Sequence, residues 1–263
     1  MSYTEIIYET EGPVGRITLN RPEKRNPLGP LTIGELLHAL ETAKNDEQIR
    51  VVVLTGAGKV FSAGGDLSSM GSGGTPLKSE GGTTTRPGTF VDLNLALTRL
   101  GKPTIARVNG HALAGGLGLV VACDVAIAAD DAQLGTPEIN VGLWPMMIMA
   151  TIFRNVPRKR GLELVMTGDK ISAQQAAELG LITRAVPKDR LDAEVQALAE
   201  KLASKSPAIM RLGLTAFHAT QDMELEPALR HLEGQLMAVL ATEDAREGLM
   251  AFLEKRQPQW KGR

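Results

Sequence analysis

This sequence of 263 residues has a single cysteine and no excess of either charge. The single cysteine, Cys123, has no partner for an internal disulfide, which is typical of a protein of a reducing compartment. Cys123 lies among apolar residues, so packing is the better interpretation of it than nucleophilic chemistry. Lysine and arginine number 29 against 30 aspartate and glutamate, and this balance gives no indication of a nucleic-acid partner.

Long apolar runs are missing as well. The longest apolar-rich run without a charge, at 139–153, is shorter than the ~20 residues that a membrane-spanning helix needs. Residues 1–12 carry acidic side chains and lack an apolar core, a pattern that does not fit a signal peptide. We therefore expect a soluble, cytoplasmic protein made of one large domain, or of one domain with an appendage.

Strand and helix signals alternate over residues 1–200. The β-rich stretches 3–9 and 14–19 flank a Gly-Pro turn and predict a hairpin. Apolar residues at helical spacing in 30–43, followed by a continuous apolar run in 50–55, predict a strand–helix–strand crossover. A strand, turn and helix at 104–123 repeat this order. The fold class is therefore α/β.

Signals for strands stop near residue 200. Four helices are predicted at 191–204, 207–220, 225–240 and 243–255. We interpret residues 1–200 as an α/β core and residues 201–263 as a C-terminal helical region. The Gly-, Ser- and Thr-rich stretch 70–89 has no periodicity and is too long for an ordinary connection, so it is either a mobile lid or disordered.

Two glycine-containing turns and one carboxylate are the candidate functional features. Gly115 and Gly116 stand where a strand turns into a helix, and backbone N–H groups at a helix start can approach a ligand oxygen closely. Two such N–H groups, from this turn and from the turn at 61–67, would form an oxyanion hole. The alternative is that the glycines only permit tight packing. Glu138 stands in a weakly charged segment, either as a proton carrier with a raised pKa or as a solvated loop charge.

Six sequence motifs resemble those of the enoyl-CoA hydratase/isomerase (crotonase) superfamily. They span nearly the whole chain, with 70–90 as the weakest part. The motifs are NRPEKRNPL at 20–28, VFSAGGDL at 60–67, VNGHALAGGLGLVVACDVAIA at 108–128, LGTPEINVGLWP at 134–145, TGDKISAQQAAELGLITRAVP at 167–187 and AFLEKRQPQWKGR at 251–263.

The resemblance implies a spiral of ββα units whose C-terminal helices form a homotrimer or a dimer of trimers. It implies an acyl-CoA thioester substrate and no cofactor or metal beyond the CoA moiety. The thioester oxygen would be held by the N–H groups of Ala63 and Gly115, with Glu138 as the acid/base. Residues bordering the CoA would be Ala63, Gly64, Gly65 and Asp66. Lys24, Arg25 and Lys255 either meet CoA phosphates or are solvated charges.

Two departures from the resemblance bear on the reaction. Hydratases of the superfamily carry two glutamates; the second matches Glu138, but the first falls at Gly118. Hydratases also have a glycine that helps to seat the catalytic water after the proline matching Pro145, where this chain has Met146. We expect Gly118, Trp144 and Met146 to line a pocket from which water is excluded.

Isomerisation of an enoyl-CoA double bond, which needs one carboxylate, is therefore favoured over hydration. Hydration stays open if an acid such as Glu80 or Asp92 replaces the missing glutamate. Other thioester reactions of the superfamily, and a non-catalytic acyl-CoA-binding homologue, stay open as well. The length of the acyl chain is not readable from the sequence.

Overall fold

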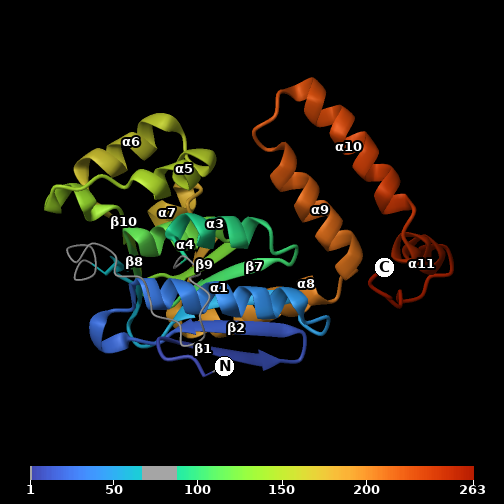
Figure 1. The fold of residues 1–263 in the computed structure, drawn as a ribbon, viewed down its shortest axis with the longest axis horizontal. Coiled ribbons are helices and arrows are strands. Elements are labelled where there is room, and N and C mark those ends of the chain that lie inside the picture. The colour runs from blue at the N-terminus through green and yellow to red at the C-terminus, as the bar shows by residue number, and fades with distance from the viewer. Residues whose placement is uncertain (1, 67–87) are drawn as a thin grey trace, which may run out of the picture.

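The fold is built on a main sheet, which has six strands in the computed structural model over the described residues, 2–66 and 88–263 (Figure 1). The first strand pairs antiparallel with the second, and all other pairs are parallel. In spatial order the strands are β1 (Ile6–Glu11), β2 (Val14–Leu19), β4 (Val51–Gly56), β7 (Thr104–Val108), β9 (Val125–Ala129) and β12 (Arg184–Val186).

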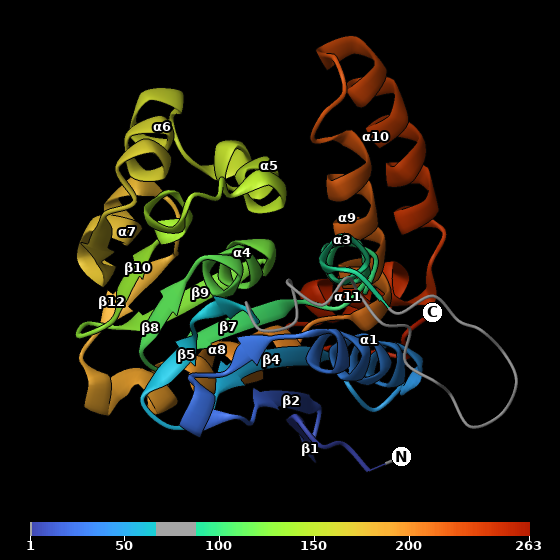
Figure 2. The same ribbon diagram turned by 60° about the vertical axis from the view of Figure 1, so that its left-hand side comes forward.

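The predicted hairpin and crossover are both confirmed. β1 and β2 form the hairpin, and α1 (Pro30–Asn45) connects β2 to its parallel neighbour β4. Every residue of β4 is buried, because helices cover both faces of this part of the sheet. One face packs against α1, α3 (Phe90–Thr98) and α4 (Gly115–Ala122), and the other against α8 (Leu191–Ala203) (Figure 2).

A smaller sheet, which the sequence does not predict, lies beside the main one. Its described strands are ordered β11-β10-β8-β5, and a short two-stranded sheet, β3-β6, stands next to it. The pairs β5–β8 and β8–β10 are parallel, and β10–β11 is antiparallel. The bounds are β3 (Pro27–Leu28), β5 (Val60–Ser62), β6 (Gly64–Gly65), β8 (His111–Leu113), β10 (Gln133–Gly135) and β11 (Lys170–Ser172).

The later part of the chain is mainly helical, as predicted. The predicted capping box of Ser172 and Gln175 opens α7, and Gly180 ends it in a left-handed conformation with φ 85°. The remaining elements are η1 (Pro22–Lys24), η2 (Pro137–Val141), α5 (Met146–Asn155), α6 (Arg158–Thr167), α7 (Ala173–Leu179), η3 (Lys188–Arg190), α9 (Pro207–Thr220), α10 (Leu225–Leu240) and α11 (Glu243–Leu253). Most of the stretch 70–89 lies outside the described residues.

The helices α9 and α10 form a hairpin that extends away from the sheets, and α11 returns beside it (Figures 1 and 2). Large apolar side chains on α10 and α11 are exposed in the single chain; Leu225, Leu229 and Phe252 are 75%, 58% and 81% exposed. Among the described helices, none combines the length and the apolar character that crossing a membrane requires. The division of the chain near residue 200 stays a prediction.

Candidate active site

Three parallel strands of the smaller sheet bring the candidate residues to one edge. Ser62 of β5 pairs with Ala112 of β8, and Leu113 of β8 pairs with Gly135 of β10. The segments that follow these strands contain Gly65, Gly115 and Glu138. Carboxyl ends of parallel strands are the usual position of a ligand site in α/β proteins. The short strands thus gather residues that lie far apart in the sequence.

Gly115 is the first residue of α4, and the turn before it is strained. Ala114 has φ 51° and ψ −127°, a conformation that residues with a Cβ rarely adopt, and its N–H donates to the Gly135 carbonyl at 2.9 Å. The helical ladder begins with Gly118, whose N–H donates to the Ala114 carbonyl at 3.1 Å. The N–H of Gly115 belongs to the first turn, where no intrahelical acceptor exists. It is suited to hold a ligand oxygen.

The N–H of Ala63 is already used within the protein. It donates to the Arg25 carbonyl at 2.9 Å, so it is not available to a substrate oxygen. The expectation that Ala63 supplies the second donor of the oxyanion hole is therefore wrong. The sequence shows that two glycines follow Ala63. It does not show which N–H group of this segment is hydrogen-bonded to the Arg25 carbonyl.

The N–H of Gly65 is the candidate for the second donor of the oxyanion hole, in place of the N–H of Ala63. The next N–H, that of Asp66, donates to the Leu28 carbonyl of β3 at 3.3 Å, and neighbouring N–H groups along a strand point to opposite sides. The N–H of Gly65 therefore points away from β3. Gly64 has φ 97°, which breaks the alternation between Ala63 and Gly65. The Gly65 nitrogen lies 3.5 Å from the position of a Cβ built on Gly115, so the two candidate donors are close.

A buried asparagine that sequence reasoning missed holds the segment before Gly65. The Asn26 side chain is 1% exposed, and its Nδ2 donates to the carbonyls of Ala57, Val60 and Phe61 at 3.0, 2.8 and 3.2 Å. Ser62 Oγ donates to the Asn26 carbonyl at 2.7 Å. The sequence shows only that Asn26 is a polar residue inside the motif at 20–28. Its burial becomes apparent in the fold. Asn26 thus links the loop after η1 to β5.

Glu138 is a half-buried carboxylate rather than a solvated loop charge. It lies in η2, and burial raises the pKa of its carboxyl above the ordinary value, with a hydrogen bond from its own backbone N–H offsetting part of the rise. Its Oε2 atom is buried and has no hydrogen-bond partner among the described residues. A buried unpaired acceptor is rare in proteins and is often explained by a functional role. A carboxyl group with a raised pKa is better suited to accept and return a proton than a solvated one, so Glu138 is the candidate acid/base.

The space beside Gly118 is filled by apolar side chains. A Cβ atom built on Gly118 would lie 3.0 Å from Ile148 Cβ and from Phe90 Cζ, and closer still to Ile148 Cγ2. The glycine thus lets α5 pack directly on α4. Met146 stands two residues before Ile148, about 200° around the helix, and is 63% exposed. Ile148 rather than Met146 fills the space beside Gly118, and a role of Met146 in lining a pocket stays a prediction.

The other expected site residues are dispersed. Lys24 ends η1 and Arg25 follows it, and both side chains are exposed beside β3. Lys255 follows α11, which packs on α9 and α10 at the other end of the molecule from β8 (Figure 1). Within one chain the three basic residues do not form one phosphate site. Trp144 is half-buried, and its indole N–H donates to Met149 Sδ at 3.4 Å.

Two neighbouring backbone N–H groups and a half-buried carboxylate, in the segments that follow parallel strands, are typical of enzymes that stabilise an oxyanion. The family model of enoyl-CoA hydratase/isomerase matches residues 9–263, so the chain belongs to the enoyl-CoA hydratase/isomerase (crotonase) superfamily. Its α/β fold is the one that solved members of this superfamily share.

Individual relatives agree with this membership. The chain is 37% identical to the 2,3-dehydroadipyl-CoA hydratase of Escherichia coli over 262 residues, covering 99% of this chain and all of the relative. An enoyl-CoA hydratase/isomerase structure from Mycobacterium paratuberculosis is 32% identical over the full length of both chains, with a TM-score of 0.91. A structure described as enoyl-CoA hydratase/isomerase (crotonase) from Legionella pneumophila is 30% identical, with a TM-score of 0.85, and covers 99% of this chain and 100% of its own.

Proposed function

We propose that the chain isomerises the double bond of an enoyl-CoA, converting a 3-enoyl to a 2-enoyl thioester through Glu138. The proposal rests on two observations together: Glu138 is half-buried, and apolar side chains fill the space beside Gly118, where the resemblance puts the first of the two hydratase glutamates. One carboxylate is sufficient for isomerisation, because the proton it removes is the proton it returns.

The reaction has two proton transfers. The thioester carbonyl oxygen accepts hydrogen bonds from the N–H groups of Gly115 and Gly65, which lowers the pKa of the protons on the α carbon. The Glu138 carboxylate takes one α proton, and the electron pair moves into a dienolate whose oxyanion stays in the hole. The protonated Glu138 then delivers the proton to the γ carbon, and the double bond ends conjugated with the thioester.

Apolar packing beside α4 supports isomerisation over hydration. Hydration needs a group that orients a water molecule for attack on the β carbon, and the side chains of Ile148 and Phe90 carry no hydrogen-bonding atoms. Asp92, an acid that could replace the missing glutamate, accepts hydrogen bonds from the N–H and the hydroxyl of Thr89, each at 2.7 Å, in the capping box of α3. The other candidate acid, Glu80, lies outside the described residues.

Hydration of a 2-enoyl-CoA is the second candidate function. Names of relatives favour it, among them that of the 2,3-dehydroadipyl-CoA hydratase of Escherichia coli. In this reaction Glu138 would deliver or remove the proton, and the oxyanion hole would be used in the same way. Neither reaction changes the oxidation state of the substrate as a whole, so neither needs a cofactor beyond the CoA moiety. Gly64 to Asp66 would border the CoA, and Lys24 and Arg25 stand exposed nearby for its phosphates.

Product analysis separates the two candidates. Purified protein is incubated with 3-enoyl- and 2-enoyl-CoA thioesters of several chain lengths, and the products are identified by mass and by chromatography. We expect conversion of 3-enoyl to 2-enoyl thioesters at a rate well above hydration. Glu138→Gln should remove most activity, because the amide keeps the shape but cannot take the proton. Glu163→Gln, at an exposed position on α6, is the control. Dominant formation of 3-hydroxyacyl-CoA would overturn the proposal in favour of hydration.

A further inference from the structure

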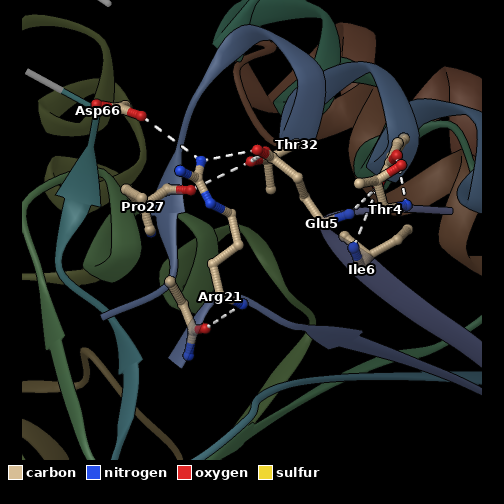
Figure 3. Close-up of polar contacts among 9 residues, drawn as sticks. Thr4, Glu5, Ile6, Arg21, Pro27, Thr32 and Asp66 are labelled. Carbon is tan, nitrogen blue, oxygen red and sulfur yellow. Dashed lines mark hydrogen bonds and ion pairs between the residues drawn. The ribbon is translucent and has the colours of Figure 1, made fainter. Parts of the chain in front are cut away.

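Three charged side chains connect the residue that precedes β1 to the segment that contains Gly65. Arg21 Nη1 lies 2.8 Å from Glu5 Oε1 and 3.6 Å from Asp66 Oδ2 (Figure 3). All three side chains are mostly buried, with exposed fractions of 17%, 14% and 19% for Arg21, Glu5 and Asp66. The guanidinium therefore stands between two carboxylates in a region of reduced solvent screening.

Glu5 is the fixed end of this arrangement. Its backbone N–H and those of its two neighbours in the chain donate to the Glu35 carboxylate of α1 at 2.8 to 3.1 Å. Its own carboxylate accepts a short hydrogen bond from the hydroxyl of Thr32, which is also within 3.2 Å of the Pro27 carbonyl (Figure 3). Helix α1 and strand β3 thus hold Glu5, and Glu5 holds Arg21.

Asp66 is the end that bears on the candidate oxyanion hole. It follows Gly65 directly, and its carboxylate lies 3.5 Å from the position of a Cβ built on Gly29, the residue that precedes α1. The start of a helix favours a negative charge, so the helix and Arg21 attract the same carboxylate. The Asp66 Cα and the peptide plane that carries the Gly65 N–H are separated by one peptide unit and the Gly65 Cα, so fixing the Asp66 side chain restricts how that plane can turn.

We propose that Arg21 is a positioning residue: its guanidinium, anchored by Glu5, holds Asp66 so that the Gly65 N–H points toward that of Gly115. This inference rests on the proposed role of Gly65 and Gly115 as oxyanion donors. Arg21 is suited to this role because its Nη1 atom faces both carboxylates and is held in a rigid planar guanidinium, which a flexible lysine ammonium does not reproduce. Without a cation at this position, Glu5 and Asp66 would repel each other and turn the segment.

The test compares Arg21→Lys, Arg21→Met and Glu5→Gln with a matched control. Arg107→Lys is that control, because Arg107 has the same 17% side-chain exposure and pairs with Asp192 of α8 on the other face of the main sheet. Steady-state kcat and KM are measured with the thioester that the wild type converts fastest, and Tm is measured for every variant. A second readout needs no turnover: the near-ultraviolet absorbance of the enolate formed when a 3-oxoacyl-CoA binds.

The expected result is a loss of kcat with little change in KM. Removing a whole oxyanion donor costs ~10²–10³ in kcat, so a misdirected donor in Arg21→Met should cost about 10-fold or more. Arg21→Lys should lie between Arg21→Met and the wild type. Glu5→Gln should lower kcat less, and it should add little to Arg21→Met, because both changes release the same link. The enolate signal should weaken in the same order, and Arg107→Lys should keep both readouts.

Failure of this inference and failure of the proposed function give different patterns. An active wild type with unchanged kcat and enolate signal in Arg21→Met would overturn the role of Arg21 and leave the isomerase proposal standing. Loss of kcat only in proportion to a lowered Tm, matched by Arg107→Lys, would also overturn it. A wild type that turns over no enoyl-CoA but loses its enolate signal in Arg21→Met would support Arg21 and contradict the isomerase. Absence of both signals in the wild type would overturn both.

Discussion

Gly118 of α4 packs so closely against Ile148 of α5 that a Cβ atom at residue 118 would lie 3.0 Å from the Ile148 Cβ and closer to its Cγ2. Gly118 stands where hydratases that resemble this chain have a catalytic glutamate. Its lack of a side chain therefore has a second effect besides the loss of a carboxylate. It allows a second helix to occupy the space. Because the β-branched side chain of Ile148 is restricted at χ1, moving it away from residue 118 would cost free energy.

Replacing Gly118 by alanine should destabilise the protein, although alanine is the better helix former. The intrinsic gain of ~1 kcal/mol in a helix interior is smaller than the ~1–3 kcal/mol that overpacking a core typically costs. Gly213→Ala in α9 is the matched control, because a Cβ at Gly213 meets nothing within 4 Å. Thermal unfolding should give a lower Tm for Gly118→Ala and an equal or higher Tm for Gly213→Ala. A raised Tm for Gly118→Ala would show that α5 does not close on α4.

Introducing the missing carboxylate should require removing the side chain that fills its place. Gly118→Glu alone should fold poorly, since the glutamate meets Ile148 and buries a charge. Gly118→Glu with Ile148→Ala should recover part of the lost stability and raise the ratio of hydration to isomerisation. The products of both variants are compared with those of Ile148→Ala. An unchanged ratio in the double variant would mean that a second acid at residue 118 does not reach the reacting carbons.

The ionised carboxylate of Glu138, the form that accepts a proton from the substrate, should lower the stability of the folded protein. Its pKa is raised in the folded protein by burial, so the ionised form is the disfavoured one there. At a pH above the raised pKa, Glu138→Gln should therefore unfold at a higher Tm than the wild type. As pH falls through the raised pKa, the wild type protonates and the difference should shrink. A Tm difference that grows as the pH is lowered would contradict the assigned direction of the shift.

The apolar surfaces of α10 and α11 should be buried in a homo-oligomer, which we predict to be a trimer or a dimer of trimers. Leu229 and Phe252 are 58% and 81% exposed in the single chain, and exposed apolar surfaces of this kind mark sites of association. Light scattering should give a mass above that of one chain, and Leu229→Glu with Phe252→Glu should lower it. Truncation after Ser206 should yield aggregates or separated subunits. A monomeric wild type would disprove the idea.

The bounds of long helices could be predicted from the sequence almost to the residue. The bounds 207–220 and 225–240 match α9 and α10 because each carries an apolar repeat over several turns. Strands β5, β8 and β10 could not be predicted, since three residues are too few to show a period. These short strands are the elements that bring the candidate site together.

The sequence also predicts some single residues of the candidate site and not others. Gly115 could be predicted because it stands at a recognisable strand-to-helix turn. The second donor was assigned to Ala63, two residues before Gly65, because the sequence does not show that the Ala63 N–H is bonded to the Arg25 carbonyl. The contact of Ile148 with Gly118 could not be predicted, because the start of α5, which decides the direction of each of its side chains, could not be read from the sequence.

Transfer of a deuteron within the substrate tests the proposed single-carboxylate shuttle most directly. A 3-enoyl-CoA deuterated at the α carbon is converted by the wild type, and the 2-enoyl product is examined by mass spectrometry and NMR. If Glu138 carries the proton in a site from which water is excluded, part of the deuterium should appear at the γ carbon, and Glu138→Gln should abolish product formation. A product whose γ carbon carries only solvent hydrogen, formed at a rate that Glu138→Gln leaves unchanged, would contradict the account.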